Sequence, residues 1–203
     1  MADITPDLVK RLRDLTGAGM MDCKKALEES NGDIEEAVVL LRERGIAKAA
    51  KRAGRATAQG VVESYLHRTG DYPPQTGTLV EVNCESDFVA KGDEFRALAR
   101  ELAMHVAAAA PRWVSREEVP ESVIAQEREI YKAEAEGSGR PAAAMEKIIE
   151  GKLEAFYKDN VLLEQAWIRD PKVPIRDLIA ENVSKLQENI VVRRFARFSI
   201  KEE

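Results

Sequence analysis

Apolar residues recur at steps of three and four through about residue 47, and from about residue 58 they alternate with polar residues. The first spacing places side chains on one face of a helix, and the second places them on one face of a strand. The chain therefore needs both kinds of element. The pattern predicts a helix-rich α+β fold with a small antiparallel sheet.

Residues 1–47 are predicted to form a separate three-helix domain. Thr5 and Pro6 supply a capping hydroxyl and a first-turn proline for a helix with the apolar stripe Ile4, Leu8, Leu12 and Leu15. A second helix is predicted over residues 20–29. A third helix, predicted to end at Gly45, has the stripe Ile34, Ala37, Val38 and Leu41. Three stripes of this length can cover only one another, which predicts a small bundle.

A basic segment, residues 48–57, is predicted to be a solvated linker to an α+β core domain, residues 58–203. Residues 60–67 and 78–84 are rich in valine and alternate in polarity, so they are predicted to pair as two antiparallel strands joined by a hairpin loop. A long helix is predicted next, with one apolar face made of Phe95, Leu98, Ala99, Leu102 and Val106.

The second half of the core is predicted to contain a helical hairpin at about residues 121–158. Its helices, 121–136 and 142–158, are separated by a breaker cluster in which Pro141 is placed to open the second helix. A further helix is predicted over 174–187, with the apolar residues Leu178, Ile179, Val183 and Leu186. Residues 189–200 are predicted to be a third strand whose buried face is Ile190, Val192, Ala196, Phe198 and Ile200.

Composition limits the function classes that need to be considered. Hydrophobic residues make up 44% and charged residues 33% of the chain, which is typical of an ordinary globular protein. The longest uncharged run, which includes residues 102–110, is far shorter than the roughly 20 residues of a membrane span. The net charge of −5 argues against an affinity for nucleic acid that rests on phosphate neutralisation. Local basic patches are compatible with this net charge.

The N-terminal residues and the two cysteines both favour the cytoplasm. The N-terminus carries acidic residues where a signal or transit peptide would carry Lys or Arg, and no apolar segment follows them. Cys23 and Cys84 lie in differently patterned regions without a CxxC motif. Both are predicted to be reduced, packed thiols in a cytoplasmic protein.

The sequence offers few residues for catalysis. His67 and His105 have no partner at metal-ligand spacing, so no metal site is predicted. There is no phosphate-binding P-loop, and the fragment Gly17-Ala18-Gly19 fails as a dinucleotide loop because Asp22 occupies the third glycine position. No nucleophile can be paired with a base. The sequence therefore predicts no enzyme, no cofactor and no nucleotide bound by the chain itself.

Two segments depart from the pattern of a plain core. Met20 and Met21 are adjacent after a glycine turn, and neighbours on a helix point about 100° apart, so at most one can lie fully in a small core. Exposed methionines suit a binding surface, whereas the alternative is that both fill gaps in the bundle. Between a strand and the long helix, Ser86 or Asp87 can cap the helix with Phe88 as a hydrophobic staple. The functional alternative there is a rigid, protruding tip that presents an aromatic ring and a carboxylate.

Together these segments resemble the bacterial elongation factor Ts family. The stretch TGAGMMDCKKALEESNGDIEEAVVLLRERG is similar to that family's N-terminal domain, LVEVNCESDFVAK resembles its strand-loop motif, and NIVVRRFARF resembles its closing strand. Ser86 stands where the motif usually has Thr. The length resembles the family's short form, because no internal repeat matches the second core subdomain of longer members.

The resemblance implies a nucleotide exchange factor for the GTPase elongation factor Tu, with an N-terminal ubiquitin-associated-like domain. It implies partner contacts in that domain by Gly17, Ala18, Gly19, Met20, Met21 and Lys24. It also implies an exchange wedge, which enters the partner near its Mg²⁺ site and consists of Ser86, Asp87, Phe88, Val89 and Ala90. The contact surface that the second subdomain supplies in longer members is then either absent or supplied by a second copy, as a homodimer. The alternatives are a three-helix module that recruits a peptide or an RNA, and a small hydrolase.

Overall fold

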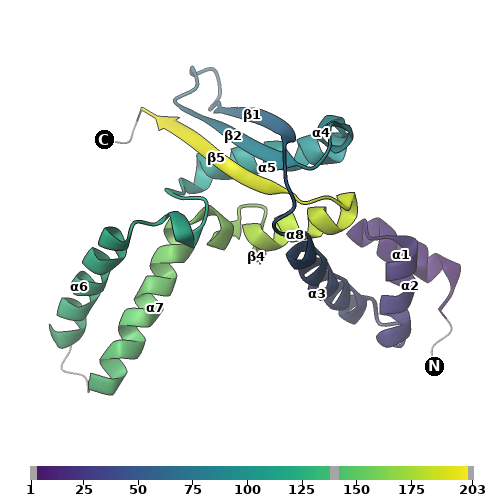
Figure 1. Ribbon diagram of the computed structural model, residues 1–203, viewed down its shortest axis with the longest axis horizontal. Coiled ribbons are helices and arrows are strands. Elements are labelled where there is room, and N and C mark those ends of the chain that lie inside the picture. The colour runs from purple at the N-terminus through teal and green to yellow at the C-terminus, as the bar shows by residue number, and fades with distance from the viewer. Residues whose placement is uncertain (1–3, 138–141, 201–203) are drawn as a thin grey trace. The chain divides into compact units, whose positions relative to one another are not determined.

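The computed structural model describes residues 4–137 and 142–200, and the protein is α+β as the sequence predicts. Three helices come first, namely α1 (Pro6–Thr16), α2 (Met20–Glu29) and α3 (Ile34–Arg52) (Figure 1). By contacts, the chain divides into two compact units. One comprises residues 1–62, 81–99 and 177–191, and the other comprises the rest. The proposed division into domains at residues 47 and 58 stays a prediction.

The ends of the first helices follow from local chemistry. The Thr5 hydroxyl accepts the Leu8 N–H at 3.3 Å, and Pro6 is the first helical residue of α1. Gly17 ends α1 in the left-handed conformation (φ 65°), which glycine adopts without steric cost. Asp33 caps α3 by accepting the Glu36 N–H at 3.0 Å. The predicted start of α1 and both bounds of α2 are confirmed.

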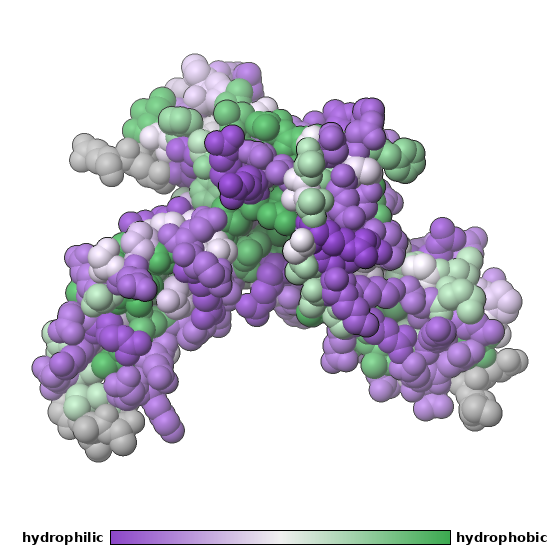
Figure 2. Space-filling model, in the orientation of Figure 1, coloured by the Kyte–Doolittle hydropathy of each residue, from purple (hydrophilic) through white to green (hydrophobic). Residues whose placement is uncertain are grey.

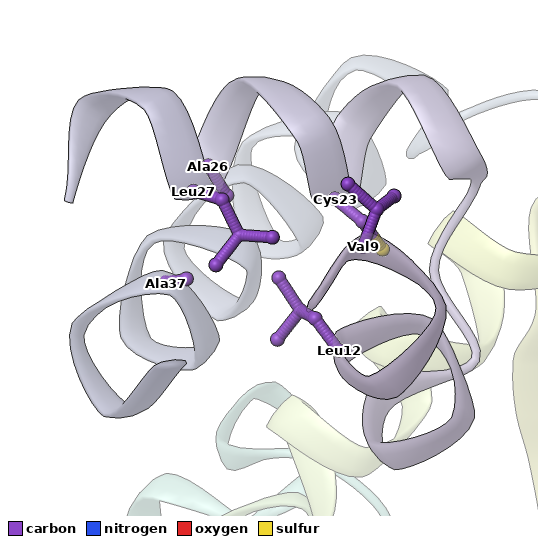
Figure 3. Close-up of a cluster of buried hydrophobic side chains, with 6 residues drawn as sticks. All are labelled: Val9, Leu12, Cys23, Ala26, Leu27 and Ala37. Carbon is purple, nitrogen blue, oxygen red and sulfur yellow. The ribbon is translucent and has the colours of Figure 1, made fainter. Parts of the chain in front are cut away.

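The three helices bury one apolar cluster, shown in Figure 3, made of Val9, Leu12, Cys23, Ala26, Leu27 and Ala37. Two residues predicted to belong to the stripes, Leu15 and Val38, are exposed instead. At 100° per residue, a buried face centred between Val9 and Leu12 leaves Leu15 about a quarter turn away. The prediction was right about the bundle and wrong about these two positions.

The predicted end of α3 at Gly45 is wrong, because the helix continues to Arg52. The residues after Gly45 include three alanines and two lysines, which are strong helix formers. Gly45 is buried, and a Cβ placed on it would lie 3.7 Å from the Ser184 Cβ. The glycine therefore faces Ser184 at a distance of ordinary contact. The first part of the predicted linker, residues 48–52, is helical.

The sheet has three strands, β1 (Gln59–His67), β2 (Thr76–Cys84) and β5 (Val191–Ser199), in the order β1-β2-β5. Neighbouring strands run antiparallel, since Gly60 lies beside Val82 at one end and Leu66 beside Gly77 at the other. Helix α5 (Asp93–Ala109) packs with the sheet, and the Thr78 hydroxyl donates to the Ala103 carbonyl at 2.9 Å. All five residues predicted for the apolar face of α5 are buried.

The predicted buried face of the last strand is only half right. Ile190 and Val192 are buried, but Ala196, Phe198 and Ile200 are exposed. In this half of β5 the odd positions face α5, since the Arg197 guanidinium donates to the Ala107 carbonyl at 3.1 Å. The even positions therefore lie on the uncovered face. Figure 2 shows hydrophobic residues gathered over the region where Figure 1 draws this sheet.

The predicted helical hairpin is present as α6 (Glu121–Gly137) and α7 (Ala142–Asn160), while Pro141 and the rest of the breaker at 138–141 lie outside the described residues. Helix α8 (Ile175–Leu186) matches the predicted helix near 174–187. The short elements were not predicted, namely α4 (Asp87–Lys91), η1 (Arg116–Glu118), η2 (Leu162–Glu164), β3 (Ala166–Trp167) and β4 (Asp170–Pro174). Among the described residues, no helix is long and apolar enough to span a membrane.

Candidate functional site

The segment that joins β2 to α5 contains the short helix α4 and begins with a side-chain cap. The Ser86 hydroxyl accepts the Val89 N–H at 3.3 Å, and Ser86 itself is extended (φ −122°, ψ 156°). This is the geometry of a helix N-cap, so Ser86 caps a helix as predicted, but that helix is the short α4 and not the long helix α5. The cap fixes the direction in which the first residues of α4 point.

Phe88 is the most exposed of the large apolar side chains in the described residues, at 84%. A hydrophobic staple would be packed against the helix, so the interpretation of Phe88 as a staple is wrong. A full phenyl ring in water is unfavourable by about 2 kcal/mol relative to a buried one. Such exposure on a short, capped helix suits a residue that becomes buried against another molecule.

Among the residues beside Phe88, two anchor the short helix and one carries a charge. Val89 and Ala90 are buried within this chain, and they hold α4 in place. Asp87 is exposed and pairs with Lys91 at 2.7 Å across one helical turn. The hydrogen bond and the charge of Lys91 lower the pKa of Asp87, so the carboxyl is ionised at neutral pH. The tip therefore presents one aromatic ring beside one carboxylate.

A shallow depression adjoins this tip on the same compact unit. It is lined by Asp87, Phe88, Val89, Lys91, Gly92, Asp93, Glu94 and Leu186. The lining surface is mainly apolar, and several of the lining residues are charged, a combination found in many protein interfaces. Phe88 thus stands beside a hollow that a partner side chain can enter.

Two acidic residues that the sequence did not single out support the tip. The Glu188 carboxylate accepts the N–H groups of Glu85 and Ser86, at 3.1 and 3.0 Å, and the Ser86 hydroxyl at 2.5 Å. The Glu85 carboxylate accepts the Asn189 N–H at 2.7 Å. The two segments are about a hundred residues apart in sequence, so no local pattern could have revealed the pairing.

The second set of predicted residues lies at the junction of α1 and α2. Met20 and Met21, at 49% and 64%, are both exposed, so the alternative that both fill the bundle core is wrong. Gly17, Gly19 and Lys24 are also exposed, and Ala18 packs against the bundle core. Lys24 lies 3.8 Å from Glu28 in an exposed pair. This junction therefore exposes two apolar methionine side chains and the Lys24 cation.

The remaining reactive groups are two histidines and two cysteines, of which the sequence predicts burial for the cysteines. His67 is exposed, and His105 is buried in α5. Cys23 and Cys84 are free and buried. Burial, and then the charge of Glu188, raise the pKa of Cys84 to about 11, and burial also raises that of Cys23. Both thiols are therefore protonated at neutral pH.

Comparison with known proteins agrees with this fold. Residues 5–202 match the family described as Elongation factor TS. The chain is 54% identical over 199 residues to "Elongation factor Ts" of Carboxydothermus hydrogenoformans, covering 98% of this chain and 90% of that relative. It is also 54% identical over 200 residues to "Elongation factor Ts" of Fervidobacterium nodosum, covering 98% of this chain and 100% of that relative.

These matches, on an α+β protein with a small three-stranded sheet, place the chain among the translation elongation factors. Within that class, the chain belongs to the elongation factor Ts family. The resemblance inferred from the three sequence stretches is thereby confirmed.

Proposed function

We propose that this chain is a nucleotide exchange factor rather than an enzyme. In the cytoplasm, it binds the GDP-bound form of the GTPase elongation factor Tu and accelerates the release of GDP, so that GTP can rebind. Membership of the elongation factor Ts family supports this function. The single observation that carries it is the exposure of Phe88, which lies beside the ionised Asp87 on a capped and anchored helix.

The tip can act without forming or breaking a covalent bond. A GTPase holds GDP largely through its phosphates and the Mg²⁺ that bridges them, so displacing the elements around the ion removes much of that affinity. The Phe88 ring stabilises the displaced arrangement by burying apolar surface, and the Asp87 carboxylate perturbs the field around the ion. Linkage requires that GDP weaken the binding of the factor by the same ratio.

The second set of residues has a different role in this proposal. Met20 and Met21 offer flexible apolar side chains, and Lys24 offers a cation, to the nucleotide-binding domain of the partner. These contacts bring the two proteins together, and the tip formed by Asp87 and Phe88 changes the partner. Binding and displacement are thus assigned to separate residues of the chain.

Release of a fluorescent GDP analogue from elongation factor Tu tests the proposal. The wild-type chain should accelerate release, and Phe88→Ala should reduce the acceleration about thirtyfold, because a central interface residue contributes about 2 kcal/mol. Tyr72→Ala is the matched control, since Tyr72 is also a highly exposed aromatic residue, at 72%. It should exchange normally. Release that the wild-type chain leaves unchanged would refute the function.

We also propose that two copies of the chain associate through the uncovered face of the sheet. Leu66, Leu79, Phe198 and Ile200 are exposed there and line one apolar groove. A second copy supplies a matching face, because an association about a two-fold axis sets the same residues against one another. The sequence pattern supports this occupant, since no internal repeat in these 203 residues matches the second core subdomain of longer members of the family.

A further inference from the structure

The residues before the Phe88 tip and those after α8 exchange hydrogen bonds in both directions. Glu188 accepts from the backbone of Glu85 and Ser86, and Glu85 accepts from the backbone of Asn189. Each carboxylate thus satisfies N–H groups of the opposite segment. Buried or partly buried backbone donors are costly when unpaired, so the two segments hold one another in register.

Ser86 is the point at which this arrangement meets the tip. Its hydroxyl donates to Glu188 at 2.5 Å and at the same time accepts the Val89 N–H that begins α4. A hydroxyl has one donor hydrogen, so the bond to Glu188 fixes the rotamer whose lone pairs face α4. The orientation of the cap, and with it of Phe88, therefore depends on Glu188.

The position of Glu188 is itself set by the chain before it. Gln187 adopts the left-handed conformation (φ 59°), and its N–H bonds to the Val183 carbonyl at 3.0 Å, which ends α8 and turns the backbone. The Arg52 guanidinium donates to the Gln187 side chain at 3.0 Å. A backbone and a side-chain hydrogen bond of Gln187 therefore fix the turn that precedes the Glu188 carboxylate.

Positive charge stabilises the second carboxylate of this arrangement, that of Glu85. Arg55 and Arg52 lie 3.5 and 3.8 Å from the Glu85 carboxylate, and the Asn189 side chain donates to the Arg55 carbonyl at 2.9 Å. The Asn189 N–H, followed by these guanidinium groups, lowers the pKa of Glu85. The Glu85 carboxylate is thus ionised at neutral pH, and an ionised carboxylate accepts stronger hydrogen bonds than a neutral carboxyl group does.

We propose that Glu188 is a positioning residue for exchange, which orients the Phe88 tip through its three hydrogen bonds to Glu85 and Ser86. The inference rests on the proposed function and assigns to that function a residue outside the loop that touches the partner. Glu188 acts through Ser86 and makes no contact with the nucleotide site. Loss of the Glu188 carboxylate leaves the Phe88 ring present but with a less fixed orientation, which reduces the rate of the exchange step.

Glu188→Ala tests the proposal in the full chain. The maximal rate of GDP release at saturating factor should fall about tenfold, within the range that loose positioning costs. The concentration of factor for half-maximal rate should change less than twofold, because the contacts at the α1–α2 junction remain. Glu188→Gln should restore most of the rate, since its amide oxygen can accept both backbone N–H groups and its amino group can donate to the Ser86 hydroxyl.

Glu181→Ala is the matched control, because Glu181 is an acidic residue of α8 that pairs with Lys185 instead of the tip. It should leave the rate unchanged. Amide hydrogen exchange at Glu85 and Ser86 gives a readout that needs no partner, and it should become faster in Glu188→Ala but not in Glu181→Ala. A normal maximal rate for Glu188→Ala would overturn the proposal, as would unchanged amide protection. If the wild-type chain does not accelerate GDP release from elongation factor Tu, the exchange function is refuted. The amide exchange data would still test the hydrogen bonds of Glu188.

Discussion

His105 is a titratable residue enclosed within α5, and its hydrogen bonds define its protonation state. The Gln165 amide donates to the carbonyls of Ala109 and Asp159 at 3.2 and 2.7 Å, so its oxygen faces His105. That oxygen accepts from His105 Nε2 at 3.0 Å, which assigns the proton to Nε2. The buried Nδ1 has no hydrogen-bond partner among the described residues. A second proton would therefore have no acceptor.

We expect stability to fall in weak acid because of this residue. Burial lowers the pKa of His105, so the unfolded chain, with a pKa near 6.5, takes up a proton before the folded chain does. The stabilisation is complete above about pH 6.5 and is lost as pH falls toward the folded pKa, at up to about 1.4 kcal/mol per pH unit. Urea unfolding at pH 7, 6 and 5 measures this slope.

The same titration in His105→Phe separates this residue from the carboxylates that also titrate. The variant should be less stable at pH 7, since it loses the bond to Gln165, but its stability should fall less steeply between pH 7 and 5. Equal slopes for the two proteins would show that His105 does not govern the acid response.

At the scale of a helix, Gly45 lies inside α3 rather than at its end. Glycine in a helix interior costs about 1 kcal/mol relative to alanine. The nearest atoms that a Cβ would meet, on Ser184 and Ala180, lie at 3.7 Å or beyond, which is ordinary contact. The site therefore has room for a methyl group.

Gly45→Ala should raise the free energy of unfolding by about 0.5 to 1 kcal/mol, because it removes conformational freedom from the unfolded chain without a clash. Gly17→Ala is the contrasting variant. Gly17 has φ 65°, and a Cβ would approach the Lys185 side chain to 2.7 Å, so stability should fall by about 1 kcal/mol. Thermal or urea unfolding compares the two. A loss of stability in Gly45→Ala would mean that the approach to α8 is tighter than these distances indicate.

Helices and strands that are long enough to show a repeating apolar pattern could be predicted from the sequence, whereas elements of a few residues could not. The five-residue face of α5 and both bounds of α2 follow from spacing and capping chemistry. The two-residue strand β3 has no period to detect, and α3 passed through Gly45 because the residues beyond it favour a helix. The even positions of β5 are apolar apart from Arg194, but periodicity does not say which face α5 covers.

At the scale of the whole molecule, the proposed dimer rests on the uncovered face of the sheet. Phe198→Asp should weaken self-association about thirtyfold or more, because it places a charge within an apolar contact. Sedimentation velocity over a range of concentrations measures the equilibrium. Val39→Asp, at another exposed apolar residue, should leave it unchanged. A wild-type chain that stays monomeric at high concentration would exclude the dimer.

The candidate site could be found from the sequence only in part. Its motif was visible as Ser86, Asp87 and Phe88, because these are adjacent and resemble a known family. The anchoring role of Val89 and the support from Glu188 depend on burial and on contacts between distant segments, which no local pattern encodes. Tertiary hydrogen bonds thus complete a site that the sequence only outlines.

The burial of both native cysteines has a practical consequence for following the tip as it moves. Cys23 and Cys84 are enclosed, and burial keeps their thiols protonated at neutral pH. A maleimide fluorophore reacts with exposed thiolates, so a single cysteine introduced on the surface of α4 would be labelled selectively. The natural chain is therefore ready for distance measurements by energy transfer, with both native cysteines left in place.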